Sequence, residues 1–341
     1  MLRLQKYEYS FPPELIAQKP AVPRDAARLL VFKKKEKKIF HDIFKNLAAY
    51  LPLGAVLVCN DTKVLPARLI AYKSTGGKVE ILYIATVRGL LQVLADRKIA
   101  AGSRLALTSR LFFDVAKSDG RFYYLRPLFP PGRLNGILER HGIAPIPPYI
   151  RHPEASGKKL REQYQAIFAK KSGAIAAPTA SLHFTKRLVT KLGHGGFPIR
   201  FITLHVGLGT FAPLTASQLA AGKLHAEQYR IDPVIARFLN EAKKQGRPII
   251  AVGTTVVRAL ESAADKSGRL KKLQGTADLF IREKYRFRFV DGIITNFHVP
   301  RSSLLMLVSS FTGRKQSIAL YKTAIQKKYR LFSFGDGMLL Y

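Results

Sequence analysis

Cysteine is almost absent from the chain: its 341 residues include one, Cys59. A single cysteine cannot form a disulfide within the chain, and it cannot supply a cage of cysteine ligands for a metal. An iron–sulfur cluster takes three or more cysteines, which excludes radical enzymes of that class. The cysteine content therefore predicts a reducing, intracellular setting.

Long apolar runs are also missing. The first residues, MLRLQKYEYSF, lack the apolar stretch of a signal peptide, and the strongest apolar run near the end covers only residues 304–311. A membrane span needs about 20 such residues. We expect a cytoplasmic protein that does not cross a membrane.

Acidic residues are scarce. Asp and Glu total 22 against 57 Lys and Arg, which gives a formal charge of +35 spread along the whole chain. Such an excess of positive charge fits a polyanionic partner, although a host whose proteins are generally basic would produce a similarly basic surface. The length allows two or three domains at roughly 100–200 residues each, and 47% hydrophobic residues suffice for packed cores.

Within the first 150 residues, the sequence pattern changes at residue 64 from mixed strand and helix signals to short β-like runs. Before it, strand-like runs at 29–32 and 38–40 precede a helical pattern at 42–51 and a buried-strand pattern at 55–60. From residue 64 to about 124, short β-like runs are separated by Gly, Asp and Ser, and proline-rich passages follow up to residue 150. This succession of short β-like runs predicts a small β-barrel domain over 64–150, inserted into an α/β domain formed by 1–63 and 151–341.

The rest of the chain alternates helical and strand patterns. Helices are expected at 160–171, 188–196, 234–246 and 317–329, with strands between them. The predicted fold class is α/β: a mixed, partly parallel sheet with covering helices, interrupted by the inserted barrel.

Four strand-like runs end in clusters of Thr, Ser, His and Gly. They are AAPTASLHFT (176–185), TLHVGLGTF (203–211), AVGTTVVRALES (251–262) and TNFHVPRSSLL (295–305). In open α/β sheets ligands bind beyond the carboxyl ends of the strands, where helix N-termini offer free N–H groups. We expect the clusters to form a ligand site.

The first cluster predicts a capped helix. Pro178 ends the apolar run, and Thr179 or Ser181 can cap a helix whose first turn carries His183 and Thr185. Such a helix start binds anions, but a plain capped helix with a surface histidine fits as well.

In the third cluster, Thr254 or Thr255 can cap a helix directly after Gly253. Arg258 and Glu261 are three residues apart on that helix and are expected to pair. Arg258 alternatively binds a carboxylate or a phosphate.

The second and fourth clusters place histidines near strand ends. His205 precedes Gly207 and Gly209, which let a backbone approach a ligand closely, but the third glycine of a dinucleotide motif is missing. His298 and Arg301 precede a Ser302 or Ser303 cap, an arrangement that suits an acidic group or a solvated turn.

Metal or serine chemistry has little support. His183, His205, His225 and His298 have no i, i+4 spacing between them, although His225 and Glu227 form a His-x-Glu pair. No Gly-x-Ser-x-Gly motif marks a nucleophilic serine. A metal hydrolase is therefore the minority interpretation.

Several motifs, in order along nearly the whole chain, resemble one family. They are PRDAARLL (23–30), VLVCNDTKVLPARL (56–69), GGKVEILYI (76–84), IPPYIR (146–151), QYQAIFA (163–169), VDGIITNFHVPRSSLLMLVSSFTG (290–313) and YRLFSFGDGMLL (329–340). With the four clusters, they resemble the S-adenosylmethionine:tRNA ribosyltransferase-isomerases.

The resemblance implies an activity. Such an enzyme moves the ribosyl part of S-adenosylmethionine, its cosubstrate, onto 7-aminomethyl-7-deazaguanine at the tRNA wobble position, giving epoxyqueuosine and releasing adenine and methionine. As usually proposed, a base removes a proton beside the sulfonium, adenine leaves, and the amine attacks the rearranged sugar. Family members need no metal and no bound cofactor, so the resemblance implies neither here, and they are often taken as monomers.

The resemblance also implies roles for residues. Proton transfer near neutral pH favours histidine, with carboxylates behind it. The catalytic candidates are His183, His205, His225, His298, Glu227 and Asp61. The expected substrate-binding residues are Thr62, Arg68, Pro178, Thr179, Ser181, Thr185, Gly207, Gly209, Thr210, Gly253, Thr254, Thr255, Arg258, Thr295, Asn296, Arg301 and Ser302.

Basic and aromatic residues interleave at 282–289 and 326–330. Such segments neutralise phosphates and stack on unpaired RNA bases, although an exposed strand would show the same alternation at 282–289. The chain departs from the family pattern at Ser181 (usually glycine), Ala212 (usually arginine) and Glu283-Lys284 (commonly Pro-Gly).

Two other classes remain open. A non-catalytic RNA-binding protein would explain the charge but not the four clusters. An S-adenosylmethionine-dependent RNA methyltransferase would share the cosubstrate, but its acidic, glycine-rich first strand turn is not found in the sequence.

Overall fold

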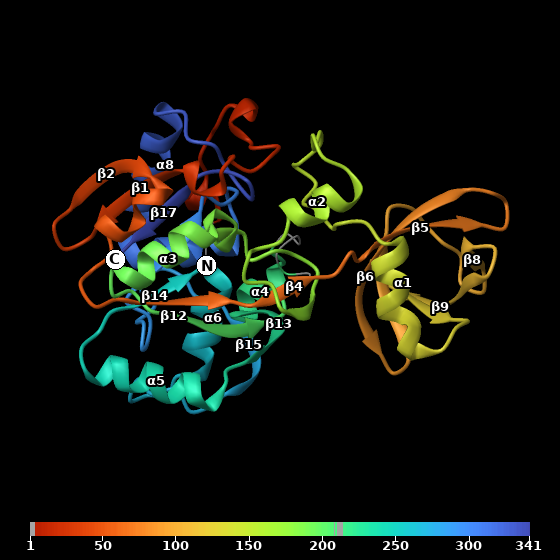
Figure 1. Cartoon of the computed structure of the whole chain (residues 1–341). Coiled ribbons are helices and arrows are strands. Elements are labelled where there is room, and N and C mark those ends of the chain that lie inside the picture. The colour runs from red at the N-terminus through yellow and green to blue at the C-terminus, as the bar shows by residue number, and fades with distance from the viewer. Residues whose placement is uncertain (1–3, 208, 210–213) are drawn as a thin grey trace.

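The chain folds into a large α/β body and a smaller β-barrel joined by a narrow neck (Figure 1). The computed structural model describes residues 4–207, 209 and 214–341. Both marked chain ends lie in the large body, so the barrel is reached and left through the neck.

The large body is built on a nine-stranded sheet of order β15-β13-β12-β3-β14-β16-β17-β1-β2. Pairing is parallel for β12 with β3, β3 with β14, β14 with β16 and β1 with β17, and antiparallel elsewhere. Central strands such as VLVCN are apolar throughout because both faces of a parallel sheet are covered. The strands are β1 (Arg28–Lys33), β2 (Lys38–Ile43), β3 (Val56–Asn60), β12 (Ile199–Leu204), β13 (Lys223–Arg230), β14 (Ile249–Val252), β15 (Gln274–Leu279), β16 (Gly292–Asn296) and β17 (Gly337–Leu340).

Helices cover both faces of this sheet. On one face α5, α6, α7 and α8 pack through Leu239, Val257, Leu305 and Leu320, and on the other α3 packs through Leu188. The helices are α1 (Leu134–His141), α2 (Gly157–Gln163), α3 (Lys186–His194), α4 (Ala216–Ala221), α5 (Pro233–Lys244), α6 (Thr254–Ala263), α7 (Ser303–Thr312) and α8 (Arg314–Gln326). Short 3₁₀ helices are η1 (Leu4–Tyr7), η2 (Pro13–Leu15), η3 (Arg24–Ala26), η4 (Phe44–Ala49), η5 (Pro131–Arg133) and η6 (Thr179–His183).

The smaller body is a closed barrel of order β10-β7-β6-β5-β8-β9. Alternate residues such as Leu69, Val79 and Phe113 fill its interior. The strands are β5 (Arg68–Lys73), β6 (Lys78–Val87), β7 (Leu90–Ala95), β8 (Arg104–Thr108), β9 (Leu111–Asp119) and β10 (Phe122–Pro127). The predicted fold class is confirmed; residues 64 and 150 as domain limits stay a prediction.

Three chain segments meet at the neck, namely 62–68, 142–143 and 171–174. Strand β4 (Thr62–Val64) pairs in parallel with β11 (Lys171–Ala174), and Arg68 forms an isolated bridge with Ile143. Gly142 lies so close to the Pro66 carbonyl that an added Cβ would be 1.8 Å from its oxygen. At the neck, therefore, the backbone at Gly142 contacts the backbone at Pro66 directly.

Some local predictions were wrong. The helical pattern at 42–51 forms only the 3₁₀ helix η4, and the helix expected at 160–171 ends at Gln163. Beyond it, Tyr164 and Phe168 are buried in apolar clusters, so the helical spacing there reflects core packing. Residues 282–289 form no strand.

Candidate functional site

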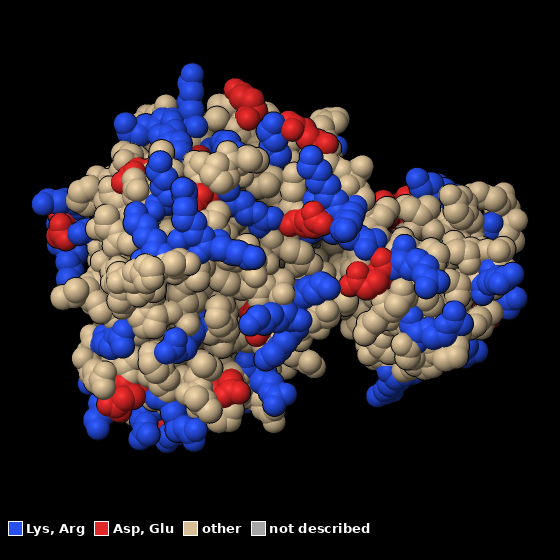
Figure 2. All heavy atoms as spheres, viewed as in Figure 1, with Lys and Arg blue, Asp and Glu red and all other residues tan. Residues whose placement is uncertain are grey.

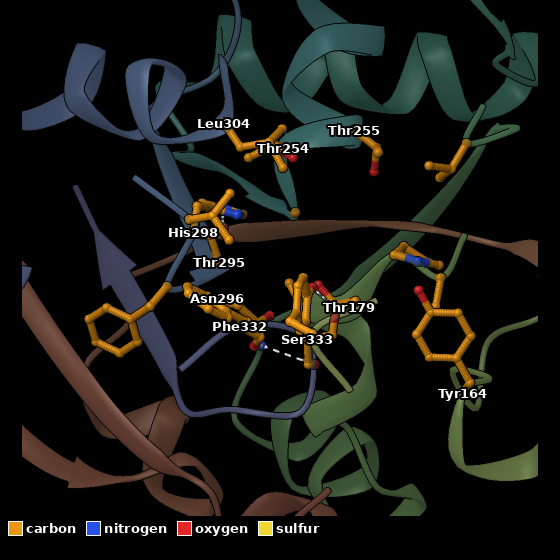
Figure 3. Close-up of a pocket in the computed structure, with 18 of the residues that line it drawn as sticks. Tyr164, Thr179, Thr254, Thr255, Thr295, Asn296, His298, Leu304, Phe332 and Ser333 are labelled. Carbon is orange, nitrogen blue, oxygen red and sulfur yellow. Dashed lines mark hydrogen bonds between the residues drawn. The ribbon is translucent and has the colours of Figure 1, made fainter. Parts of the chain in front are cut away.

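One pocket lies at the carboxyl ends of β14 and β16 (Figure 3). It is lined by 177–180, 253–255 and 295–299, with contributions from distant segments. Thr254 and Thr255 lie on one side and face Thr179, Asn296 and Ser333 across it. Three of the four predicted clusters meet here, and the second contributes Val206.

Helix α6 begins at the pocket wall. Its N-cap is Gly253, whose φ of 97° suits glycine, and no side chain caps the helix. The predicted Thr254 or Thr255 cap is therefore wrong. Both threonines instead line the pocket, and the Thr255 hydroxyl has no partner within the described part of the chain.

Arg258 lies one turn further along α6 and also lines the pocket. Its Nη2 pairs with Glu227 of β13, and both side chains are almost completely buried. Glu227 Oε1 also accepts the Gly207 N–H at 2.9 Å. The predicted Arg258–Glu261 pair is wrong, because Glu261 accepts backbone N–H groups of residues 288–290.

Asn296 ends β16 with 2% of its surface exposed. Its Nδ2 donates to the Phe332 carbonyl at 2.9 Å, which fixes the amide orientation. Oδ1 has no partner among the described residues. A buried acceptor of this kind can accept from a ligand or from the ring of His183, whose pKa burial lowers while its interaction with the Asn296 side chain raises it.

His298 follows β16 in the same pocket. Its Nε2 lies 2.8 Å from the Thr295 hydroxyl, and its backbone N–H donates to the Tyr321 hydroxyl. Burial lowers the pKa of His298 to about 4, so the ring is neutral at pH 7.

His183 is buried behind the pocket. It stacks on Phe44 with ring centroids 4.7 Å apart. Burial, aided by Arg330 and Arg24, lowers its pKa to about 3. A ring buried in this way is badly placed to exchange protons with a substrate.

His205 lies beyond β12, at the neck. Its Nδ1 is 2.8 Å from the Thr62 hydroxyl, and its ring packs against Gly173, where an added Cβ would be 2.7 Å from the ring. Burial lowers its pKa, the Asp61 charge opposes that shift, and Lys171 adds to it. Asp61 itself accepts the Thr203 hydroxyl at 2.7 Å.

The remaining predicted site residues lie outside this pocket. Ser302 caps α7 as predicted, whereas Thr185 caps α3 in place of Thr179 or Ser181. Arg301 pairs with Glu8 at 2.7 Å.

Four further predicted site residues lie elsewhere. His225 is exposed on β13, and Gly209 lies beside it. Ser181 is fully buried, and Arg68 pairs with Glu80 in the barrel. Thr210, and Ala212 among the family departures, lie outside the described residues.

Several pocket residues carried no chemical signal in the sequence. Tyr149, Tyr164, Phe332 and Ser333 complete the wall, and the Tyr149 hydroxyl is 2.7 Å from the Ser333 hydroxyl. Burial raises the pKa of Tyr149 to about 12, so it keeps its proton. These residues lie in the motifs IPPYIR, QYQAIFA and YRLFSFGDGMLL, which were noted only for their resemblance.

The described residues contain neither a metal-binding cluster nor a membrane-spanning helix. No three His, Cys, Asp or Glu side chains there are grouped to hold a metal ion. No helix in that part is both long and apolar enough to cross a membrane.

Comparisons with known proteins cover almost the whole chain. A family described as "Queuosine biosynthesis protein" matches residues 4–340. The S-adenosylmethionine:tRNA ribosyltransferase-isomerases of Halothermothrix orenii and Carboxydothermus hydrogenoformans are 42% and 43% identical, over 99% of this chain and 100% of theirs. The chain belongs to the S-adenosylmethionine:tRNA ribosyltransferase-isomerase family. The family predicted from the motifs is confirmed, and the chain is a transferase of queuosine biosynthesis and tRNA modification.

A solved structure agrees with this assignment. The crystal structure of S-adenosylmethionine tRNA ribosyltransferase from Thermotoga maritima is 33% identical, with a TM-score of 0.56 over 98% of this chain and 100% of that one.

Proposed function

We propose that the chain transfers and isomerises the ribosyl moiety of S-adenosylmethionine onto 7-aminomethyl-7-deazaguanine at the wobble position of tRNA. Epoxyqueuosine-tRNA forms, and adenine and methionine leave. The names of the relatives support S-adenosylmethionine and tRNA as substrates. The observation that carries the proposal is the pocket in Figure 3, because three of its lining residues have a buried polar atom without a hydrogen-bond partner among the described residues: Thr255 Oγ1, Arg258 Nε and Asn296 Oδ1.

These atoms suit the two ends of S-adenosylmethionine. The N–H groups at the start of α6 can donate to a carboxylate, as can the Nε–H of Arg258, whose Nη2 already pairs with Glu227, so we place the methionine end there. Asn296 Oδ1 accepts a hydrogen bond from a ribose hydroxyl or an amino group. The rings of Tyr149 and Phe332, with centroids 5.0 Å apart, supply a face for a base or for the sulfonium cation.

His298 is the base that the geometry favours. It is the catalytic candidate on the pocket wall, and it is neutral at pH 7 and can accept a proton, although a pKa of about 4 makes it a weaker base than an exposed imidazole. When its Nε2–H donates to Thr295, Nδ1 keeps its lone pair and accepts a proton from the carbon beside the sulfonium. His183 is too buried for this role, and His205 lies at the neck.

The test incubates the protein with S-adenosylmethionine and tRNA carrying the 7-aminomethyl base, and measures free adenine. We expect adenine release, reduced about a hundredfold or more by His298→Asn. His194→Asn, at the exposed end of α3, is the matched control and should keep the wild-type rate. Absence of adenine, or S-adenosylhomocysteine in its place, would contradict the proposal and favour a binding protein or a methyltransferase.

A further inference from the structure

The face of β12, β13 and β15 that points away from α6 presents two rows of polar side chains. Thr203 is opposite Arg230, and Arg230 is opposite Gln274. In the next row the His205 N–H donates to the Gln228 carbonyl, and Gln228 is opposite Thr276. We call this set the polar platform: Thr203, His205, Gln228, Arg230, Gln274 and Thr276.

The inner and outer members of the polar platform differ. Thr203 and His205 are fixed from below by Asp61 and Thr62. Gln228, Arg230, Gln274 and Thr276 are exposed, and their side chains make no hydrogen bond or ion pair within the described ranges. Hydrogen bonds therefore hold the two inner side chains in place, and the four outer side chains remain available to bind a ligand.

Two lysines lie beside the polar platform. Lys171 lines the same hollow and is only weakly engaged, at 3.7 Å from Asp61. Lys272 passes over Gly275, where an added Cβ would be 2.7 Å from the lysine Cε. Figure 2 shows that Lys and Arg far outnumber acidic residues on the visible face of both bodies, so counter-charges are few.

The polar platform adjoins the reaction pocket at residues 205–206, which directly follow β12. His205 belongs to the platform, and the next residue, Val206, lines the pocket. Successive side chains of an extended segment point to opposite sides, so the segment just beyond β12 separates two binding surfaces at the carboxyl end of that strand. Because consecutive Cα atoms are about 3.8 Å apart, the platform and the pocket meet at residues 205–206.

We infer that the polar platform binds the single-stranded RNA beside the modified base, an inference that rests on the proposed function. Arg230 and Lys171 bind phosphate oxygens, which suits a guanidinium and an ammonium group. The Gln228 and Gln274 amides each offer a donor and an acceptor, which read the edges of unpaired bases. The surface therefore helps to select the RNA as well as to hold it.

Binding of an RNA hairpin that carries the anticodon loop, measured by fluorescence anisotropy without S-adenosylmethionine, tests the polar platform. Gln228→Ala should weaken binding about tenfold, the loss of one base contact. Arg230→Gln should reduce the slope of log affinity against log salt by about 0.7, the loss of one phosphate contact on a single strand. Arg237→Gln removes the same charge from exposed α5 and should leave both quantities unchanged.

Crosslinking locates the contact independently. A 4-thiouridine placed next to the wobble base should crosslink to peptides 223–230 or 274–279. Crosslinks confined to other peptides, or variants that bind like the wild type, would overturn the inference. Adenine release tests the proposed function separately: an enzyme that releases adenine but shows no platform effect refutes only the platform, and one that binds without releasing adenine refutes only the reaction.

Discussion

At the residue scale, burial divides the histidines into different roles. His298 is on the pocket wall and His183 is behind it, yet burial keeps both neutral at pH 7. A histidine that stays neutral in the folded chain and is protonated in the unfolded chain makes folding depend on pH. His183 should therefore influence stability even though it is too buried to act on a substrate.

The pH dependence of stability tests the state of His183. Its folded pKa of about 3 is below the unfolded value of about 6.5, so acid favours the unfolded chain, which binds the extra proton. Below pH 6 the unfolding free energy should fall by about 1.4 kcal/mol per pH unit for this residue. His183→Phe keeps a ring against Phe44 and should remove that share of the slope between pH 7 and pH 5, measured by urea unfolding.

His298 titrates in the same direction, so part of the pH dependence should remain in His183→Phe. His194→Gln changes an exposed histidine and should leave the slope as in the wild type. An unchanged slope in His183→Phe would mean that His183 accepts a proton in the folded chain.

At the element scale, α6 links the pocket to a basic surface segment. Its first turn lines the pocket, and Glu261 near its end receives the N–H groups of residues 288–290 and the Tyr285 hydroxyl. Glu261 is 1% exposed, so its charge is balanced by these donors. The segment 282–289 is ordered by this carboxylate without forming a strand.

Replacing the Glu261 carboxylate by an amide should therefore be costly. Glu261→Gln turns one acceptor oxygen into a donor that faces backbone N–H groups, and we expect a loss of about 2–4 kcal/mol in unfolding free energy. Urea unfolding should show a lower midpoint with an unchanged m-value. Glu241→Gln, on exposed α5, should stay within about 0.5 kcal/mol of the wild type, and an equal loss there would refute the explanation.

Local signals explain what could be predicted from the sequence. The strand and helix alternation and the Ser302 cap depend on neighbouring residues, and both are confirmed. Arg258 was assigned the wrong partner because Glu227 reaches it only through tertiary packing from β13. The α6 cap was wrong because Gly253 occupies the cap position. Tyr149 and Phe332 enter the pocket from distant segments, so no local pattern could place them.

At the scale of the whole molecule, the neck sets where the barrel lies relative to the reaction pocket. Lys171 and Thr62 belong to the neck strands and contact Asp61 and His205 beside the polar platform. Any RNA bound to the platform therefore lies next to the barrel connection. The orientation of the barrel should affect RNA use more than S-adenosylmethionine use.

Gly142→Ala tests this coupling. The added methyl group would be 1.8 Å from the Pro66 carbonyl oxygen and 2.5 Å from that of Leu138, and backbone atoms cannot move aside as a flexible side chain can. The neck segments at Gly142 and Pro66 must separate, so small-angle scattering should report a changed radius of gyration. The KM for tRNA should rise about tenfold, and the KM for S-adenosylmethionine should change little. Gly136→Ala, on α1 with open space around it, is the matched control and should change neither quantity. A Gly142→Ala protein with wild-type scattering and kinetics would show that the neck tolerates the methyl group and does not control the RNA surface.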